Sequence, residues 1–227
     1  MTDSAVVRTS GVRNLARAYL RQRYAFLFYT LLLTMVAAPV LAALGLSGWL
    51  IELFLAANLL AAVMPVGAAG NRRVLLVVII VVWLARAATA WLDHPALLAM
   101  ALGVSALIGL FAAASALRFA VGATKVDAEH LYAALSAYLL AGIFFGVFYW
   151  GLEQIRPGTF FAPDEFSRMS GIYFSFVTLA TLGYGDIVPR TDVARGLAIV
   201  EGVGGQLFLA VMVARLVSLY TRGKEDD

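Results

Sequence analysis

Long apolar segments constrain this chain more than any other feature of its sequence. Six stretches of about twenty residues are dominated by apolar side chains, which is the length a helix needs to cross a bilayer. A helix satisfies all of its backbone hydrogen bonds internally, so it can lie in hydrocarbon. We therefore expect six spans, with these approximate bounds: Tyr24–Leu44, Gly48–Pro65, Val74–Leu92, Pro95–Val121, Leu131–Leu152 and Ala194–Tyr220.

The composition fits a bilayer environment. Of the 227 residues, 62% are hydrophobic and 14% are charged, whereas soluble domains have about 45–50% and 25%. The formal net charge is +3, but the basic residues cluster at the ends of the apolar segments, so we expect no nucleic-acid partner. The chain has no cysteine, and its two histidines, His94 and His130, lack ligand spacing. The expected fold class is an all-α membrane protein, surrounded by lipid and without a thiolate or histidine metal site.

The basic residues also predict the orientation. They precede the first span, occupy alternate short links and follow the last span, and the other two short links hold almost none. Those on the expected inner side are Arg8, Arg13, Arg17, Arg21, Arg23, Arg72, Arg73, Arg118, Lys125, Arg215, Arg222 and Lys224. The positive-inside rule then predicts that both termini lie in the cytoplasm. We expect the protein in the plasma or inner membrane of the cell.

The long link between the last two spans contains a second kind of segment. Within Glu153–Val193, the run Gly171–Ala180 is apolar but too short to cross a bilayer. We expect it to form a half-crossing helix, because irregular backbone at membrane depth must be buried in protein or line a cavity. The hexapeptide Thr-Leu-Gly-Tyr-Gly-Asp, residues 181–186, follows it directly.

The hexapeptide has the composition that a potassium site requires. A selective pore replaces the water shell of K⁺ with rings of backbone carbonyls that all point to one axis. Carbonyls alternate in an ordinary strand, so some residues must adopt angles that glycine tolerates best, here Gly183 and Gly185. The carbonyls of residues 181–184, with the Thr181 hydroxyl, would then form a ladder of K⁺ sites. Asp186 would attract cations to the outer mouth, and Tyr184 would brace the ladder from outside.

This hexapeptide resembles the signature sequence of the potassium channel family, and the resemblance covers about Leu131 to Tyr220. It implies an outer helix, a pore helix, a selectivity filter and an inner helix. One chain brings one filter strand and a carbonyl ring needs four, so three identical subunits are the expected partners. K⁺ in the filter is the only cofactor-like species that the resemblance implies.

The resemblance also assigns supporting residues, and some of them depart from the family pattern. Tyr173 and Phe174 stand where many members carry tryptophans, and Phe174 cannot donate a hydrogen bond to Tyr184. Val177 stands where some bacterial members carry a glutamate. The expected filter supports on the pore and inner helices are Tyr173, Phe174, Val177, Thr178 and Glu201.

The last span carries the expected gating elements. Gly205 matches the glycine hinge of the family by its spacing from Asp186, and Gly202 and Gly204 beside it also weaken the helix, although small residues here could equally serve close helix packing. The expected cavity and gate residues follow at Gln206, Leu209, Val213 and Val217. An apolar constriction near Val217 would close by dewetting.

Charge within a membrane span is costly, which draws attention to Glu52, Arg86 and Glu201. Glu52 and Arg86 are at matching depths of the second and third spans, and we expect them to form a structural ion pair. Glu201 lies near the outer end of the last span. We expect it to bond to the backbone of the pore helix or filter, with exposure at the outer surface as the alternative.

These elements predict four regions. Residues 1–23 form a basic cytoplasmic segment, 24–125 a four-helix membrane module, 126–221 the pore domain, and 222–227 a short tail without a regulatory domain. The fourth span has one basic residue, Arg118, whereas a voltage sensor needs several. We expect a channel subunit that conducts K⁺ passively without steep voltage gating, and no enzyme. A non-selective cation channel and a K⁺-uptake transporter subunit are the alternatives.

Overall fold

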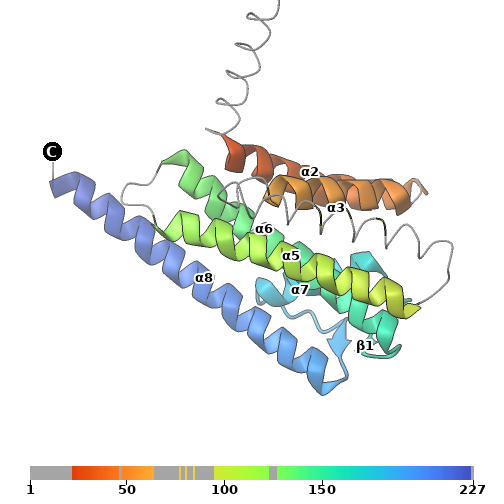
Figure 1. The fold of residues 1–227 in the computed structure, drawn as a ribbon. Helices are drawn as coiled ribbons and strands as arrows, with labels where there is room; N and C mark the ends of the chain where they lie inside the picture. The colour runs from red at the N-terminus through yellow and green to blue at the C-terminus, as the bar shows by residue number, and fades with distance from the viewer. Residues whose placement is uncertain are drawn as a thin grey trace, which may run out of the picture.

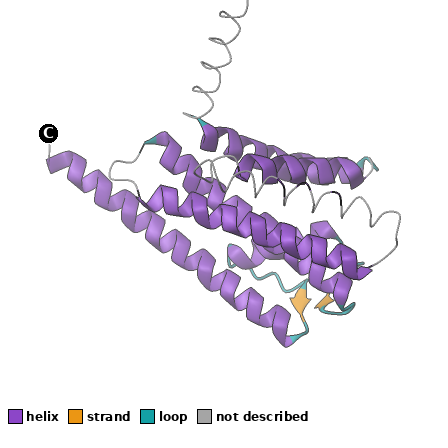
Figure 2. Ribbon diagram, viewed as in Figure 1, coloured by secondary structure: helices purple, strands orange, loops and turns teal. Residues whose placement is uncertain are grey.

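The computed structural model describes residues 22–45, 48–63, 95–122 and 127–225, together with the helical positions 77, 80 and 84. The described chain is mostly helical (Figures 1 and 2). Its elements are α2 (Arg23–Ala43), α3 (Gly48–Val63), α5 (Pro95–Gly122), α6 (Ala128–Ile155), β1 (Phe160–Phe161), α7 (Arg168–Leu179), β2 (Val188–Pro189) and α8 (Asp192–Glu225). The bounds lie within three residues of those predicted from apolar length, except at the C-terminal end of α8, which extends five residues further.

Four of these helices are long and apolar enough to cross a membrane: α2, α5, α6 and α8. Helix α3 matches the second expected span but has only 16 residues. The third expected span, Val74–Leu92, lies almost wholly outside the described residues, so six spans remain a prediction.

Helix α6 is the centre of the arrangement. It contacts α2, α5, α7 and α8, and Figure 1 shows α2 and α3 on one side of the α5–α6 pair and α8 on the other. A core of buried apolar residues joins α2, α3, α5 and α6. Small residues allow this close approach: a Cβ atom added at Gly109 of α5 would collide with the Phe144 ring of α6.

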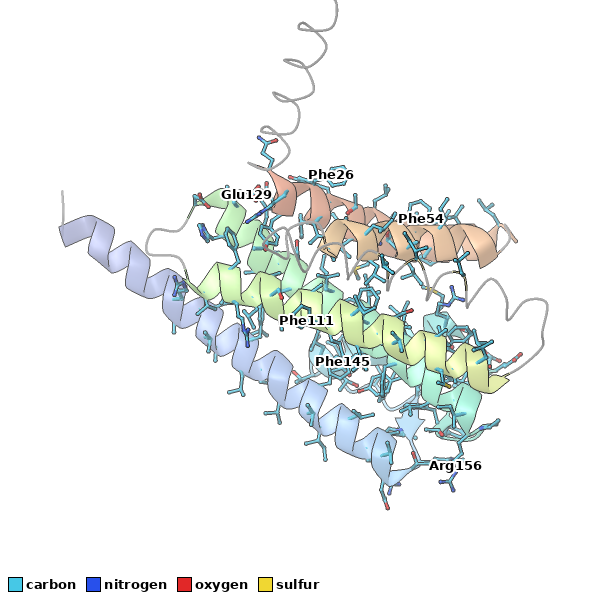
Figure 3. The ribbon with its side chains drawn as sticks, in the orientation of Figure 1. Phe26, Phe54, Phe111, Glu129, Phe145 and Arg156 are labelled. Carbon is cyan, nitrogen blue, oxygen red and sulfur yellow. The ribbon has the colours of Figure 1, made fainter. Side chains whose placement is uncertain are left out.

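The start of α6 is fixed by polar contacts. Asp127 caps the helix by accepting a hydrogen bond from the backbone N–H of His130 at 3.1 Å, and these contacts hold the pKa of Asp127 below its usual range. Glu129, labelled in Figure 3, accepts a hydrogen bond from the backbone N–H of Tyr24 at 3.1 Å. The first turn of α2 has unpaired N–H groups, so Glu129 ties α2 to the start of α6.

The link between α6 and α8 folds back on itself. Strands β1 and β2 pair antiparallel, with Phe160 opposite Pro189 and Phe161 opposite Val188. Arg190 also donates its backbone N–H to the Thr159 carbonyl at 2.8 Å. The expectation of a purely α-helical fold missed this two-stranded sheet, which joins the segment before α7 to the segment after the hexapeptide.

Candidate functional site

Helix α7 is the expected half-crossing helix, and its first turn is capped by serines. Ser167 accepts a hydrogen bond from the backbone N–H of Ser170, and Ser170 accepts one from the backbone N–H of Ser167. This reciprocal pair satisfies two donors that a helix start leaves unpaired. The prediction placed the start of this helix three residues too late, because the polar residues of its first turn interrupt the apolar pattern.

The other end of α7 turns directly into the hexapeptide. The backbone N–H of Leu182 donates to the Val177 carbonyl at 2.9 Å, and that of Thr181 donates to the Thr178 carbonyl at 3.0 Å. This pair of bonds is a Schellman motif, which ends a helix with one residue in the left-handed conformation. That residue is Thr181, with a φ of 56°. The backbone carbonyls of Val177 and Thr178 thus hold the start of the hexapeptide.

The left-handed conformation recurs at every second residue of the hexapeptide. Gly183 has a φ of 59° and Gly185 a φ of 77°, and Thr181 begins the series. A positive φ at every second residue breaks the alternation of carbonyl directions found in an ordinary strand, which a ladder of carbonyl sites requires. The prediction that both glycines adopt unusual angles is confirmed. Thr181 was missed, although the two-residue spacing of the glycines points back to it.

The outer end of the hexapeptide is held by α7 as well. The Tyr173 hydroxyl donates to Asp186 Oδ2 at 2.8 Å, and the Tyr173 and Tyr184 rings stack with centroids 6.5 Å apart. The hydrogen bond to the Asp186 carboxylate raises the pKa of Tyr173 above its ordinary value, so the phenol remains a donor. The Tyr173–Asp186 contact was not predicted from the sequence.

Phe174 supports the site in a different way. Its ring makes edge-to-face contacts with Tyr149 at 5.1 Å and Phe160 at 5.3 Å, and the Phe160 ring stacks on Phe166. This aromatic cluster packs α7 against α6 and β1. Phe174 therefore anchors helix α7 to its neighbours.

Helix α8 approaches the site closely at Gly205. A Cβ atom at this position would lie 2.5 Å from the Leu179 carbonyl at the end of α7, whereas one at Gly204 would meet nothing within 4 Å. Helix α8 is continuous through both residues. The close-packing interpretation therefore holds for Gly205, and a hinge role for Gly204 or Gly205 stays a prediction.

The expected cavity residues lie on the adjoining part of α8. Gln206 Nε2 donates to Thr181 Oγ1 at 3.3 Å, which places Gln206 at the inner end of the hexapeptide. Leu209 and Val213 are exposed in the single chain and border a groove between α8 and the start of α6. The side chain of Val217 lies outside the described residues, and so does the Glu52–Arg86 pair.

Glu201 is buried behind the site, which excludes the alternative that it is exposed at the outer surface. Its carboxyl group contacts the hydroxyl groups of Ser175 in α7 and Tyr149 in α6, the latter at 2.6 Å. The prediction of a bond to the pore helix is right, but the partners are side chains rather than backbone. Apolar periodicity could not reveal them, because they are 26 and 52 residues away.

Comparisons with known proteins identify the segment that carries this site. A family model described as "ion channel" matches residues 133–222. The inward rectifier potassium channel Kirbac3.1 of Paramagnetospirillum magnetotacticum is 34% identical over 89 residues, which are 37% of this chain and 28% of that protein. Two-pore potassium channel 4 of Arabidopsis thaliana is 42% identical over 64 residues, 26% of this chain and 22% of that protein.

A third relative is a voltage-gated potassium channel regulatory subunit, KCNF1 of Rattus norvegicus, 30% identical over 91 residues, 39% of this chain and 17% of that protein. The chain thus spans less than a third of the length of each of these relatives, and no solved structure matches it. The matched residues contain most of α6, α7, the hexapeptide and most of α8. Residues 133–222 are therefore an ion channel segment similar to segments of known potassium channels, in a chain with several helices long and apolar enough to cross a membrane.

Proposed function

We propose that this chain is one subunit of a homotetrameric channel that conducts K⁺ passively and selectively. Alternating left-handed residues at Thr181, Gly183 and Gly185 carry the proposal, because they give one strand the carbonyl alignment of a K⁺ ladder. Four such strands around one axis would complete the rings. In the single chain, Leu182 and Tyr184 are 56% and 67% exposed, which leaves this strand free to meet its symmetry mates.

The pore helix supports cation selectivity in the same geometry. The carbonyl end of α7 lies at Thr181, the inner end of the ladder, where the helix dipole favours positive charge. Asp186 at the other end of the ladder would contribute four carboxylates to the outer mouth of a tetramer. The orientation with both termini in the cytoplasm is part of this proposal.

We also propose that gating does not depend steeply on voltage. Helix α5 occupies the position before the pore domain, and Arg118 is its only basic residue. Its close contact with α6, at Gly109 and Phe144, suits a fixed scaffold better than a helix that slides. Each moving charge contributes only about 2.3 kcal/mol per 100 mV, so one arginine makes a weak sensor.

Two glycine variants test the role of the left-handed backbone in the hexapeptide. Ion flux is measured in liposomes that hold a K⁺ or a Na⁺ gradient. A Cβ atom at Gly183 or at Gly103 of α5 would meet nothing within 4 Å in the single chain, so the two differ in backbone angle and not in space. Alanine at the left-handed position costs about 1–2 kcal/mol. We expect rapid K⁺ flux and little Na⁺ flux for the wild type and Gly103→Ala, and loss of selective K⁺ flux for Gly183→Ala. Equal K⁺ and Na⁺ flux in the wild type would refute the proposal.

A further inference from the structure

The environment of Glu201 contains a hydrogen-bonding conflict that only a proton resolves. Glu201, Ser175 and Tyr149 are each at most 1% exposed. Ser175 Oγ lies 2.7 Å from the Gly142 carbonyl oxygen and also contacts Glu201 Oε1. A hydroxyl group has one proton to donate, whereas a backbone carbonyl and an ionised carboxylate can only accept. An ionised Glu201 would therefore leave one of these two contacts without a proton.

Within the part of the chain that the structure describes, no basic side chain contacts the Glu201 carboxyl group to stabilise its ionised form. The titratable groups that face it are Tyr149 and Tyr138 of α6, and α7 contributes the Ser175 hydroxyl. Helix α5 contributes apolar residues to the cavity that Glu201 borders: Leu110, Ala113, Ala114 and Leu117. Within the described part of the chain, the carboxyl group has no Arg, Lys or His partner. An unpaired buried charge is costly, and such groups become neutral instead.

We propose that Glu201 holds a proton in the folded channel, and that the neutral carboxyl group positions pore helix α7 between α6 and α8. Its acid O–H donates to Ser175 Oγ, which donates in turn to the Gly142 carbonyl, while the Tyr149 hydroxyl donates to Glu201 Oε2. The Glu201 carboxyl group and the hydroxyl groups of Ser175 and Tyr149 then each have a hydrogen-bond partner. The neutral carboxyl group connects the inner, pore and outer helices directly behind the filter strand.

This inference rests on the proposed function only for its effect on conduction, because the protonation itself is measurable without ion flux. Glu201→Gln is the matched variant, since an amide N–H can replace the acid O–H and the amide oxygen can accept from Tyr149. Glu201→Ala removes both contacts and leaves the buried Tyr149 hydroxyl without its acceptor, while Ser175 keeps only its bond to the Gly142 carbonyl. Thermal stability of the purified, detergent-solubilised assembly and infrared difference spectra report on these variants.

We expect the wild type at neutral pH to show the C=O stretching band of a protonated carboxylic acid, and Glu201→Gln to lack it. Glu201→Gln should retain the thermal stability of the wild type, whereas Glu201→Ala should reduce the fraction folded on heating by on the order of tenfold. The hydrogen bond from Glu201 to Ser175 needs the carboxyl proton, so the thermal stability of the wild type should fall as the pH rises. Glu201→Gln should lack the part of this fall that is due to Glu201.

Three results would overturn the inference. The first is that Glu201→Gln loses no carboxylic acid band, and the second is that it lowers thermal stability as much as Glu201→Ala does. The third is that the wild type and Glu201→Gln lose the same thermal stability as the pH rises. A wild type with these properties that nevertheless conducts Na⁺ as well as K⁺ would refute the proposed function and leave the protonated bridge intact. Ion flux therefore tests selective conduction, and spectroscopy with thermal stability tests the protonation of Glu201.

Discussion

At the residue scale, the hexapeptide that we propose as the filter strand includes a conformation that the Thr181 side chain does not favour. Thr181 is β-branched and has a φ of 56°, where a non-glycine residue costs about 1–3 kcal/mol. Two backbone hydrogen bonds to α7 and the Gln206 side chain hold Thr181 in place. The local strain is thus balanced by contacts from two helices, which makes the strand sensitive to the position of both.

The first prediction separates close packing from hinge bending in α8. Gly205→Ala brings a Cβ atom to 2.5 Å from the Leu179 carbonyl, and overpacking of this kind costs about 1–3 kcal/mol. Gly204→Ala meets open space in the single chain and gains helix propensity. We expect Gly205→Ala to lower the thermal stability of the purified protein and Gly204→Ala to leave it unchanged or raised. Two equally stable variants would show that packing at Gly205 is unimportant.

The second prediction concerns the outer end of the strand. Tyr173→Phe removes the donor to Asp186 and keeps the ring that stacks on Tyr184. The contact is exposed in the single chain, where solvent weakens a hydrogen bond, so we expect a small favourable coupling between the two side chains. A double-mutant cycle of Tyr173→Phe and Asp186→Asn, read by thermal stability in K⁺, measures it. Strict additivity would contradict a direct contact between the two side chains.

At the scale of elements, α7 is held by the close approach of backbones. A Cβ atom at Gly171 of α7 would lie 2.5 Å from the Gly146 carbonyl oxygen of α6, and one at Gly142 would collide with the Phe176 ring. Helices in a membrane associate through such small-residue contacts. The aromatic cluster around Phe174 and the β1–β2 pair fix the outer side of the same helix.

The third prediction tests this helix crossing. Gly171→Ala places a methyl group against backbone, which cannot move aside as a flexible side chain would. We expect a loss of about 1–3 kcal/mol, or failure to fold. Gly151→Ala on α6 is the control, because its Cβ atom would make an ordinary contact at 3.5 Å with Leu102. Heating series followed by size-exclusion chromatography compare the two. Comparable stability of both variants would contradict the crossing.

The sequence predicted the elements better than their contacts. Apolar length was sufficient for α2, α5, α6 and α8, and the short run at Gly171–Ala180 was sufficient for α7. The partners of Glu201 and the Tyr173–Asp186 bond could not be predicted, because helices that are apolar all round do not reveal which faces meet. The β1–β2 pair has two residues per strand, too few to produce an alternating pattern.

At the scale of the whole molecule, the helices α2, α3 and α5 form a module that packs against α6, the first helix of the matched segment. Glu129 joins the start of α2 to α6, and α5 packs along α6, so movements of the module would reach α7 through α6. The module carries little charge in α5, which argues for a structural role. The matched family segment, residues 133–222, begins within α6 and excludes the module.

The fourth prediction concerns voltage. Steep voltage gating requires several charges per subunit that move through the membrane field. Arg118→Gln removes the only basic residue of α5. In planar bilayers, we expect the open probability of the wild type to vary weakly with voltage and the variant to show the same slope. A steep wild-type dependence that flattens in Arg118→Gln would show that α5 is a sensor after all.

The reversal potential under bi-ionic conditions tests the central claim most directly. Purified protein is reconstituted in a planar bilayer with K⁺ on one side and an equal concentration of Na⁺ on the other. Carbonyl rings built from residues 181–184 should pass K⁺ and reject Na⁺, so current should reverse far toward the K⁺ equilibrium potential. A reversal potential near zero would mean that both ions pass equally, and it would contradict a filter built from this strand.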